Sequence, residues 1–322
     1  MAVKKDIFVS PKPMPSLNDS IFYHTIDLPG YGTFNGQWDL RGRLDDYFGY
    51  VDMARKRVLD IGTATGFLAF EAERRGAEVV AFDLSDEEPW DHVPYNPELT
   101  VKAFGRSSET LMSERKNIIG KMHNGFWFSH HALKSGAKVC YGNAYRIPRD
   151  IGDVDVSIFG SILLHMRNPL TALESAAKLT RETVIVAEPI FHELHNYNDE
   201  LPSMLLIPSV KEPLILDTWW QHTPALISTF LQILGFTRTF VNYHEQVHVA
   251  QNNAIVKYFT VVGCRPGVDA CVRNPDRKGA VTRFDQTYSQ QPEIARLKAI
   301  ENSLSWRITR RILDLYDKLL RR

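Results

Sequence analysis

The stretch that decides the fold is short, since residues 57–66 read Arg-Val-Leu-Asp-Ile-Gly-Thr-Ala-Thr-Gly. Its apolar first half predicts a buried strand, and its two glycines predict a tight turn into a helix. Residues 67–75 have helical character, and Gly76 ends the helix. A second apolar stretch at 78–83 ends in an aspartate, so residues 57–83 predict a β-α-β unit.

Apolar stretches and helical patterns continue to alternate after this unit. Further strands are expected at residues 138–141, 155–160 and 183–188, with a helix at 170–179. The alternation predicts an α/β, Rossmann-like, doubly wound sheet that is mostly parallel. Residues 236–245 and 254–263 are predicted as two long strands joined by a polar turn. They predict an antiparallel pair that places an antiparallel last strand in the sheet.

The remaining segments give the expected domain organisation. Residues 1–50, rich in proline and then in aromatic residues, predict an N-terminal arm and cap. Residues 51–265 form the Rossmann-like domain, with insertions at 86–137 and 190–222. Residues 266–322 predict a polar linker and a C-terminal amphipathic helix. That helix packs on its own domain, pairs in a homodimer or contacts a membrane surface, and the sequence leaves these alternatives open.

Composition limits the classes of protein. The 322 residues carry 38 Lys and Arg against 38 Asp and Glu, so there is no bulk attraction to nucleic acid or anionic lipid, although a local basic patch is not excluded. Three irregularly spaced cysteines predict neither a disulfide framework nor a zinc site. No membrane span and no signal-peptide core are visible, so we expect a cytoplasmic protein.

The glycine turn carries the first chemical indication. Gly62 allows a ligand to approach the backbone, and Gly66 opens a helix whose free N–H groups favour a carboxylate. Asp83 ends the second strand, where its carboxylate can accept hydrogen bonds from both hydroxyls of a ribose. Together with Asp60, the pattern favours S-adenosylmethionine. A dinucleotide would require Gly-x-Gly-x-x-Gly, and a tight β-α turn in an unrelated α/β protein is the structural alternative.

Residues that follow the other strands extend the expected cofactor site. Asn143 can bond an adenine edge, although a simple turn asparagine is equally consistent with its position. Gly160 and Ser161 end the fourth strand, at the sheet edge where open α/β sheets bind ligands. The cofactor residues expected from these strand ends are Asp60, Gly62, Thr63, Gly66, Asp83, Leu84, Asn143, Ala144, Gly160 and Ser161.

Residues 23–190 also resemble a known family. The matching pieces are Tyr23-His24-Thr25-Ile26, Gln37-Trp38-Asp39-Leu40-Arg41, Val58-Leu59-Asp60-Ile61-Gly62, Gly125-Phe126-Trp127 and Leu164-His165-Met166-Arg167-Asn168-Pro169-Leu170. They are similar to class I methyltransferases that include the tRNA wobble-uridine 5-carboxymethoxy-type enzymes and their uncharacterised relatives. The resemblance implies an S-adenosylmethionine-dependent transferase in which Trp38 and Arg41 close over the cofactor.

The chain departs from that family in its acceptor region. The wobble-uridine enzymes typically have Tyr-His-Arg-Arg where residues 164–167 read Leu-His-Met-Arg, so one carboxylate-binding guanidinium is missing. Ordinary rather than carboxylated S-adenosylmethionine is therefore expected. The N-terminal arm is not strongly basic, and residues 303–309 resemble a Ser-x-Ser-Trp-Arg-Ile-Thr motif of glycan-assembly proteins. Both features favour a small-molecule or saccharide acceptor over tRNA.

His165 is the expected catalytic base, because methylation of an alcohol benefits from a group that accepts the hydroxyl proton near neutral pH. Its alternative role is to cap the next helix. The residues expected to bind the acceptor are Arg167, Trp127, His131, Glu188, His192, Trp219, Trp220 and His222. Core packing is the alternative for Trp127 and for at least one of Trp219 and Trp220, and an ordinary surface or loop position is the alternative for His192 and His222. No metal is expected, since His130 and His131 point to different helix faces and the pair His192 and His195 lacks a third ligand.

Three functions are therefore compared. The first is an S-adenosylmethionine-dependent O-methyltransferase acting on a small molecule or saccharide. The second is a tRNA wobble-uridine methyl or carboxymethyl transferase, and the third is a non-catalytic S-adenosylmethionine-binding module. Retention of Asp60, Gly62, Gly66 and Asp83 argues against the third.

Overall fold

The computed structural model describes residues 7–85, 88, 90–191, 198–211, 213 and 215–268. The predicted C-terminal helix and the predicted substrate residue His192 lie outside these residues, as does His195.

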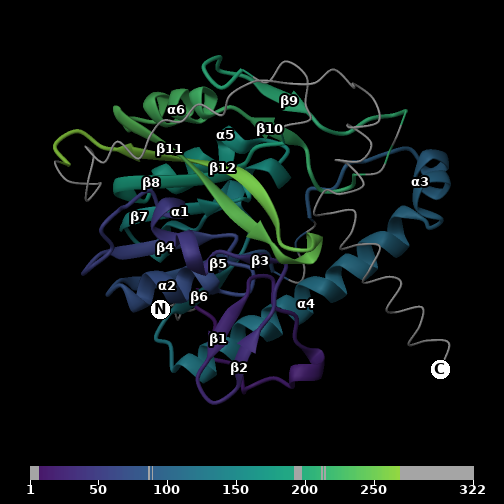
Figure 1. Ribbon diagram of the computed structural model, residues 1–322, viewed down its shortest axis with the longest axis horizontal. Coiled ribbons are helices and arrows are strands. Elements are labelled where there is room, and N and C mark those ends of the chain that lie inside the picture. The colour runs from purple at the N-terminus through teal and green to yellow at the C-terminus, as the bar shows by residue number, and fades with distance from the viewer. Residues whose placement is uncertain are drawn as a thin grey trace, which may run out of the picture.

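An eight-stranded sheet forms the centre of the molecule, in the order β3-β11-β12-β8-β7-β4-β5-β6 (Figure 1). The strands are β3 (Trp38–Asp39), β4 (Arg57–Ile61), β5 (Glu78–Asp83), β6 (Lys138–Tyr141), β7 (Val154–Gly160), β8 (Thr180–Pro189), β11 (Arg238–His248) and β12 (Ala254–Cys264). Strands β4 to β8 are parallel, whereas β12 runs antiparallel between β8 and β11. The predicted Rossmann-like sheet with an antiparallel last strand is thereby confirmed.

The strand order reverses at β4, which pairs with β5 on one side and β7 on the other. Ligands of open α/β sheets bind outside the carboxyl ends of the strands at such a switch point, because the connections on its two sides diverge there. In β4, Val58, Leu59, Asp60 and Ile61 are all buried. This continuous burial is typical of a central parallel strand covered on both faces.

Helices cover both faces of the sheet. The helices of the described residues are α1 (Leu44–Tyr47), α2 (Phe67–Arg74), α3 (Pro97–Phe104), α4 (Ser108–Leu133), α5 (Pro169–Ala177) and α6 (Pro224–Ile233), with short 3-10 turns η1 (Leu17–Asp19), η2 (Arg41–Arg43), η3 (Ala144–Arg146), η4 (Arg149–Ile151), η5 (Leu163–His165) and η6 (Val249–Gln251). Polar caps begin several of them. Asn168 accepts a hydrogen bond from the Thr171 N–H, and Pro169 occupies the first turn of α5, where a missing N–H costs nothing.

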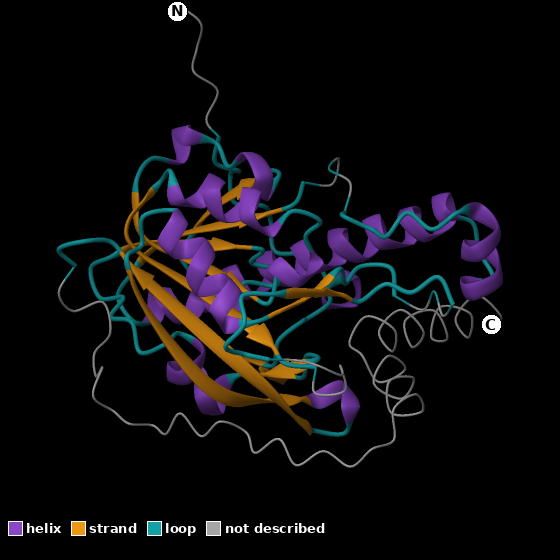
Figure 2. Ribbon diagram, turned by 90° about the horizontal axis from the view of Figure 1, so that it is seen from above, coloured by secondary structure: helices purple, strands orange, loops and turns teal. Residues whose placement is uncertain are grey.

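The helical character of residues 117–133 in the sequence predicts a helix over that stretch. Helix α4 begins nine residues before it, where the Ser107 side chain accepts a hydrogen bond from the Thr110 N–H. Figure 2 shows α4 extending beyond the sheet, with α3 at its far end. The insertion after β5 therefore forms one long wall beside the sheet.

The N-terminal cap is joined to the main sheet. Strands β1 (Ile26–Leu28) and β2 (Gly32–Phe34) form a hairpin, and β3 then pairs with β11. The second insertion contributes another hairpin, β9 (Met204–Leu206) with β10 (Trp220–His222). Among the described residues, no helix has the length and apolar character needed to cross a membrane. Cys140 is free and buried.

Candidate functional site

A cavity of about 210 Å³ lies at the carboxyl ends of β4 to β7, with walls from α4 and from the N-terminal cap. It brings together nine residues that the sequence analysis selected. They are Gly62, Thr63, Asp83, Leu84, Asn143, Ala144, Gly160, Ser161 and His165. Because they come from four different strand ends and the turns that follow, the sheet itself assembles the site.

The glycine turn has the tight geometry that its composition predicted. Gly62 and Gly66 have φ values of +75° and +86°, which other residues rarely adopt. A Cβ atom on Gly66 would lie 2.5 Å from the ring of Phe70 and 2.6 Å from that of Phe126. Gly66 precedes α2, whose first N–H groups have no acceptor within the helix. These donors can serve a carboxylate of a bound ligand.

Asp60 lies behind the turn, outside the set of residues that line the cavity. It is 1% exposed, and its Oδ2 accepts a hydrogen bond of 2.7 Å from the Thr63 hydroxyl. Burial raises the pKa of Asp60 from 3.8 to about 7, although the Thr63 hydroxyl opposes this shift. Asp60 thus contacts both the loop, at Thr63, and the backbone of Ala69 at the start of α2, so it positions the cavity wall from behind.

Asp83 lies at the cavity, where the sequence placed it. Its Oδ2 accepts from the Ala64 N–H at 2.6 Å, and its Oδ1 accepts from the Leu84 N–H at 2.7 Å. Burial raises the pKa of this carboxyl group, and the nearby His123 works in the opposite direction. Each carboxylate oxygen keeps a second lone pair. The side chain can therefore hold the loop and accept hydrogen bonds from two ligand hydroxyls.

Asn143 both caps a turn and lines the cavity, so the turn role and the ligand role that the sequence left open are compatible. Its Oδ1 caps η3 by accepting from the Tyr145 N–H at 2.9 Å, and its Nδ2 donates to Glu88 at 3.2 Å. The same residue lines the cavity together with Ala144. The turn role thus fixes the orientation of an amide at the cavity wall.

His165 belongs to η5, directly after the end of β7, and lines the cavity. Its Nδ1 lies 2.5 Å from the carbonyl oxygen of Asp217. Because a carbonyl only accepts, Nδ1 must carry the proton, and Nε2 of the neutral ring is left with a lone pair. This is the tautomer that a general base acting through Nε2 requires.

Glu188 and His222, expected at the acceptor, lie behind η5 instead. Both are almost wholly buried and neither is among the residues that line the cavity. Glu188 Oε1 accepts from the Leu163 N–H at 3.0 Å, and its Oε2 lies 3.7 Å from His222 Nδ1. The pair therefore supports the turn that carries His165.

Arg167, Trp219 and Trp220 also lie outside the cavity lining. Trp219 Nε1 donates to the Asp91 carbonyl oxygen at 2.7 Å, and the Arg167 guanidinium lies 5.1 Å from the centre of the Trp219 ring. Trp220 Nε1 donates to the carbonyl oxygen of Arg167 at 3.3 Å. These contacts fasten the first insertion to the turn after β7, and Asp91 itself lines the cavity.

Helix α4 contributes to the cavity through residues that the sequence analysis missed. Trp127 is buried in the core and donates to the Tyr141 hydroxyl at 3.2 Å, while the exposed His131 bonds the Lys12 carbonyl oxygen at 2.6 Å. The cavity is lined instead by Leu111, Glu114, Arg115, Ile118, Ile119, Met122 and His123. Several of these recur at intervals of three and four, the spacing of one helix face, which is the signal that identifies them in the sequence.

A charged pair closes the cavity between α4 and the second insertion. Arg115 Nη1 lies 2.8 Å from Asp217 Oδ2, and both side chains are only 10% exposed. The Arg115 guanidinium also lies 5.0 Å from the centre of the Trp90 ring. All three residues line the cavity, and the backbone of Asp217 orients His165.

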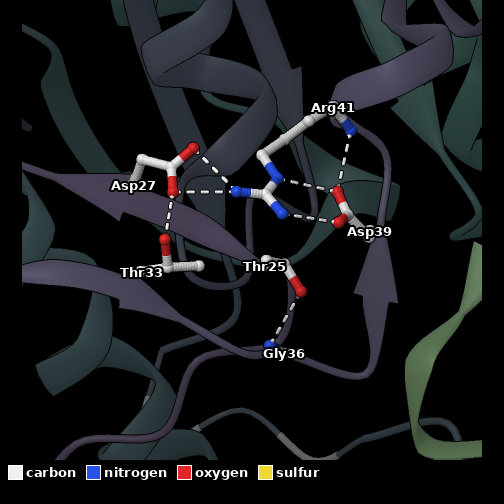
Figure 3. A network of polar contacts seen from close by, with 6 residues as sticks. All are labelled: Thr25, Asp27, Thr33, Gly36, Asp39 and Arg41. Carbon is white, nitrogen blue, oxygen red and sulfur yellow. Dashed lines mark hydrogen bonds and ion pairs between the residues drawn. The ribbon is translucent and has the colours of Figure 1, made fainter.

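Trp38 and Arg41, expected to close over the cofactor, are not among the residues that line the cavity. Arg41 forms ion pairs with Asp27 and Asp39, each at 2.7 Å, as Figure 3 shows. Trp38 is buried against Tyr258 and His248. Gln37 of the same sequence piece, together with Tyr23 and His24 of the piece before it, lines the cavity instead. Among the residues that the structure covers, no group of three or more His, Cys, Asp or Glu is arranged to hold a metal ion.

No family model matches the chain, and no curated protein matches it. Solved structures with a similar fold include an S-adenosylmethionine-dependent methyltransferase from Aquifex aeolicus (16% identity, 71% of this chain, 90% of that chain, TM-score 0.40). Magnesium protoporphyrin IX methyltransferase from Synechocystis, with bound S-adenosylhomocysteine, is 14% identical over 66% of this chain and 76% of that chain, with a TM-score of 0.37. An O-methyltransferase family protein from Burkholderia thailandensis is 16% identical over 70% of this chain and 56% of that chain, with a TM-score of 0.38. At these TM-scores, activity has to be inferred from the residues of this chain.

Proposed function

We propose that this protein is an S-adenosylmethionine-dependent methyltransferase that methylates a hydroxyl oxygen of a small-molecule acceptor. The observation that carries the proposal is one cavity lined by Gly62, Asp83, Asn143 and His165. These residues offer a close backbone approach, acceptors for ribose hydroxyls, an amide for a base edge and a proton acceptor.

The residues that would hold S-adenosylmethionine fit its chemistry. Asp83 serves the ribose, Asn143 and Ala144 serve the adenine, and the N–H groups at the start of α2 serve the methionine carboxylate. When bound, the cofactor supplies an already activated methyl group. The protein then has to align the acceptor and exclude water.

His165 is the proposed general base. Its Nε2 would take the proton of the acceptor hydroxyl, while the bound cofactor would supply the methyl group and its sulfur would keep the electron pair of the broken methyl–sulfur bond. The Asp217 carbonyl holds the ring in the required tautomer and stabilises the imidazolium that results. Glu188 acts through the backbone of η5 and is a positioning residue in this scheme.

The α4 wall favours an acceptor with an apolar body. Leu111, Ile118, Ile119 and Met122 present aliphatic side chains to the cavity. Burial of apolar surface against these four side chains stabilises an aromatic or alkyl group, whereas the hydroxyls of a saccharide would find no hydrogen-bond partner among these four. This feature makes a hydroxylated apolar compound a better candidate than a sugar.

Calorimetric titration of the full chain with S-adenosylmethionine and S-adenosylhomocysteine tests the first part of the proposal. Absence of binding at millimolar ligand would overturn it. Mass spectrometry of reactions with phenols, aliphatic alcohols, saccharides and tRNA tests the second part. We expect a methylated phenol or alcohol, and loss of product with His165→Ala. Methylation of tRNA alone would favour the wobble-uridine alternative, and binding without any product would favour a non-catalytic module.

A further inference from the structure

Two polar side chains of the N-terminal cap line the cavity, and each has a buried atom without a hydrogen-bond partner among the residues that the structure describes. The two atoms are Nδ1 of His24 and Oε1 of Gln37. His24 is only 8% exposed. Buried polar atoms in native proteins are nearly always hydrogen-bonded, because an unmade bond leaves the cost of desolvation uncompensated. The pair therefore indicates a polar ligand group at this end of the cavity.

The backbone fixes which end of the cavity this is. The Tyr23 N–H donates to the Thr65 hydroxyl of the glycine turn at 3.2 Å. The His24 ring lies 5.6 Å, centre to centre, from the ring of Phe67, which is the first residue of α2. His24 thus lies beside the start of α2, where the N–H groups of the first turn have no acceptor within the helix.

Gln37 is held next to His24 by a close backbone contact. Its N–H donates to the Tyr23 carbonyl oxygen at 2.7 Å. A Cβ atom on the preceding Gly36 would lie 2.3 Å from the carbonyl carbon of His24, so only glycine allows the two segments to approach this closely. The hydrogen bond from the Gly36 N–H to the Thr25 hydroxyl, at 3.1 Å, fixes the same contact (Figure 3).

We propose that His24 and Gln37 bind the amino-acid end of S-adenosylmethionine, an inference that rests on the proposed function. The Gln37 amide oxygen accepts from the α-ammonium group, and the His24 ring donates to the α-carboxylate beside the N-terminus of α2. Burial lowers the pKa of His24 to about 3, so its ring is neutral and keeps one donor and one acceptor nitrogen. The cap thereby recognises the part of the cofactor that Asp83 and Asn143 do not reach.

The test compares ligands with and without the amino-acid group. S-Adenosylhomocysteine and 5′-methylthioadenosine share the thioadenosine half, but only the first carries the α-amino acid. Their dissociation constants are measured by calorimetry for the wild type, His24→Phe and Gln37→Met. Gln232→Met, an exposed glutamine on α6 that bonds Thr239, is the matched control. Thermal unfolding of each variant reports on folding, and Gln37→Met keeps the test available if His24→Phe does not fold.

We expect each cap variant to weaken S-adenosylhomocysteine binding at least tenfold while the dissociation constant of 5′-methylthioadenosine changes less than twofold. Equal weakening of both ligands, or no weakening of either, would overturn the assignment while leaving the cofactor proposal standing. A wild type that binds neither ligand would overturn the proposed function and this inference together.

Discussion

Substitution of Asp83 gives the sharpest test of the cofactor site. The two carboxylate oxygens accept backbone N–H bonds of 2.6 and 2.7 Å and keep one lone pair each for a ribose hydroxyl. A hydrogen bond to a charged group contributes about 1.5–3 kcal/mol, so two contribute about 3–6 kcal/mol. Since about 1.4 kcal/mol is a tenfold change in affinity, Asp83→Ala should weaken S-adenosylhomocysteine binding by roughly 10²–10⁴-fold.

A second ligand separates this effect from loosening of the glycine turn. Asp83→Ala also removes the acceptor of the Ala64 N–H, which alone would weaken binding. Calorimetry with 2′-deoxy-S-adenosylhomocysteine completes a double-mutant cycle. Loss of the ribose 2′-hydroxyl should raise the dissociation constant of the ligand for the wild type by about tenfold or more and leave its dissociation constant for Asp83→Ala unchanged. The exposed Asp153, paired with Arg181 at 2.8 Å, provides the control Asp153→Ala. A deoxy ligand that loses as much affinity for the variant as for the wild type would refute the contact.

Four further predictions concern neighbouring residues. His165→Ala should bind S-adenosylhomocysteine like the wild type but lower kcat by about 10²–10⁴-fold, and an equal loss of binding would remove it from the base role. The pKa of Asp60 is about 7 in the folded chain, whereas its ordinary value is 3.8. The folded chain therefore holds this proton more tightly than the unfolded chain, which stabilises the fold at low pH, and this stabilisation is lost as the pH rises through 7. Urea unfolding should therefore show the wild type losing about 2–3 kcal/mol relative to Asp60→Asn between pH 5 and 7, and parallel pH profiles would contradict the shift. Glu188→Ala leaves the buried Leu163 N–H without its acceptor, so urea titrations should show a free energy of unfolding that is lower by about 3 kcal/mol or more. Glu188→Gln keeps a carbonyl oxygen and should lower the free energy of unfolding by less. Arg41→Ala breaks partly exposed ion pairs, so the free energy of unfolding should fall by less than about 1 kcal/mol. The dissociation constant of S-adenosylhomocysteine, measured by calorimetry, should change by less than twofold, whereas a large loss of affinity would restore Arg41 to the cofactor site.

The β-α-β unit was predictable because its determinants are local. The apolar run of β4, the glycines at 62 and 66 and the aspartate that ends β5 lie within 27 residues, and each constrains its own backbone. Short-range sterics and burial suffice to produce strand, turn and helix in that order. Asp83, Asn143 and His165 follow from the same reasoning, since the ends of parallel strands meet at one edge.

The assignment of side chains to the wall of the cavity or to its support depended on tertiary contacts. Glu188 and His222 are residue types suited to binding an acceptor, but β10 and η5 bury them behind the turn that carries His165. The packing of α4 along the cavity brings in Arg115 and places Trp127 in the core, a choice set by the rotation of the helix about its axis.

The sequence by itself determined the sheet, the glycine turn and the carboxylate at the end of β5, because these depend on backbone geometry within one supersecondary unit. Only the tertiary structure decided that His24 and Gln37, rather than Trp38 and Arg41, reach the cavity. That outcome depends on the hydrogen bond between Tyr23 and Thr65 and on the close approach at Gly36, contacts between segments that no local pattern relates. The tautomer of His165 was likewise decided by the Asp217 carbonyl, 52 residues away in the chain.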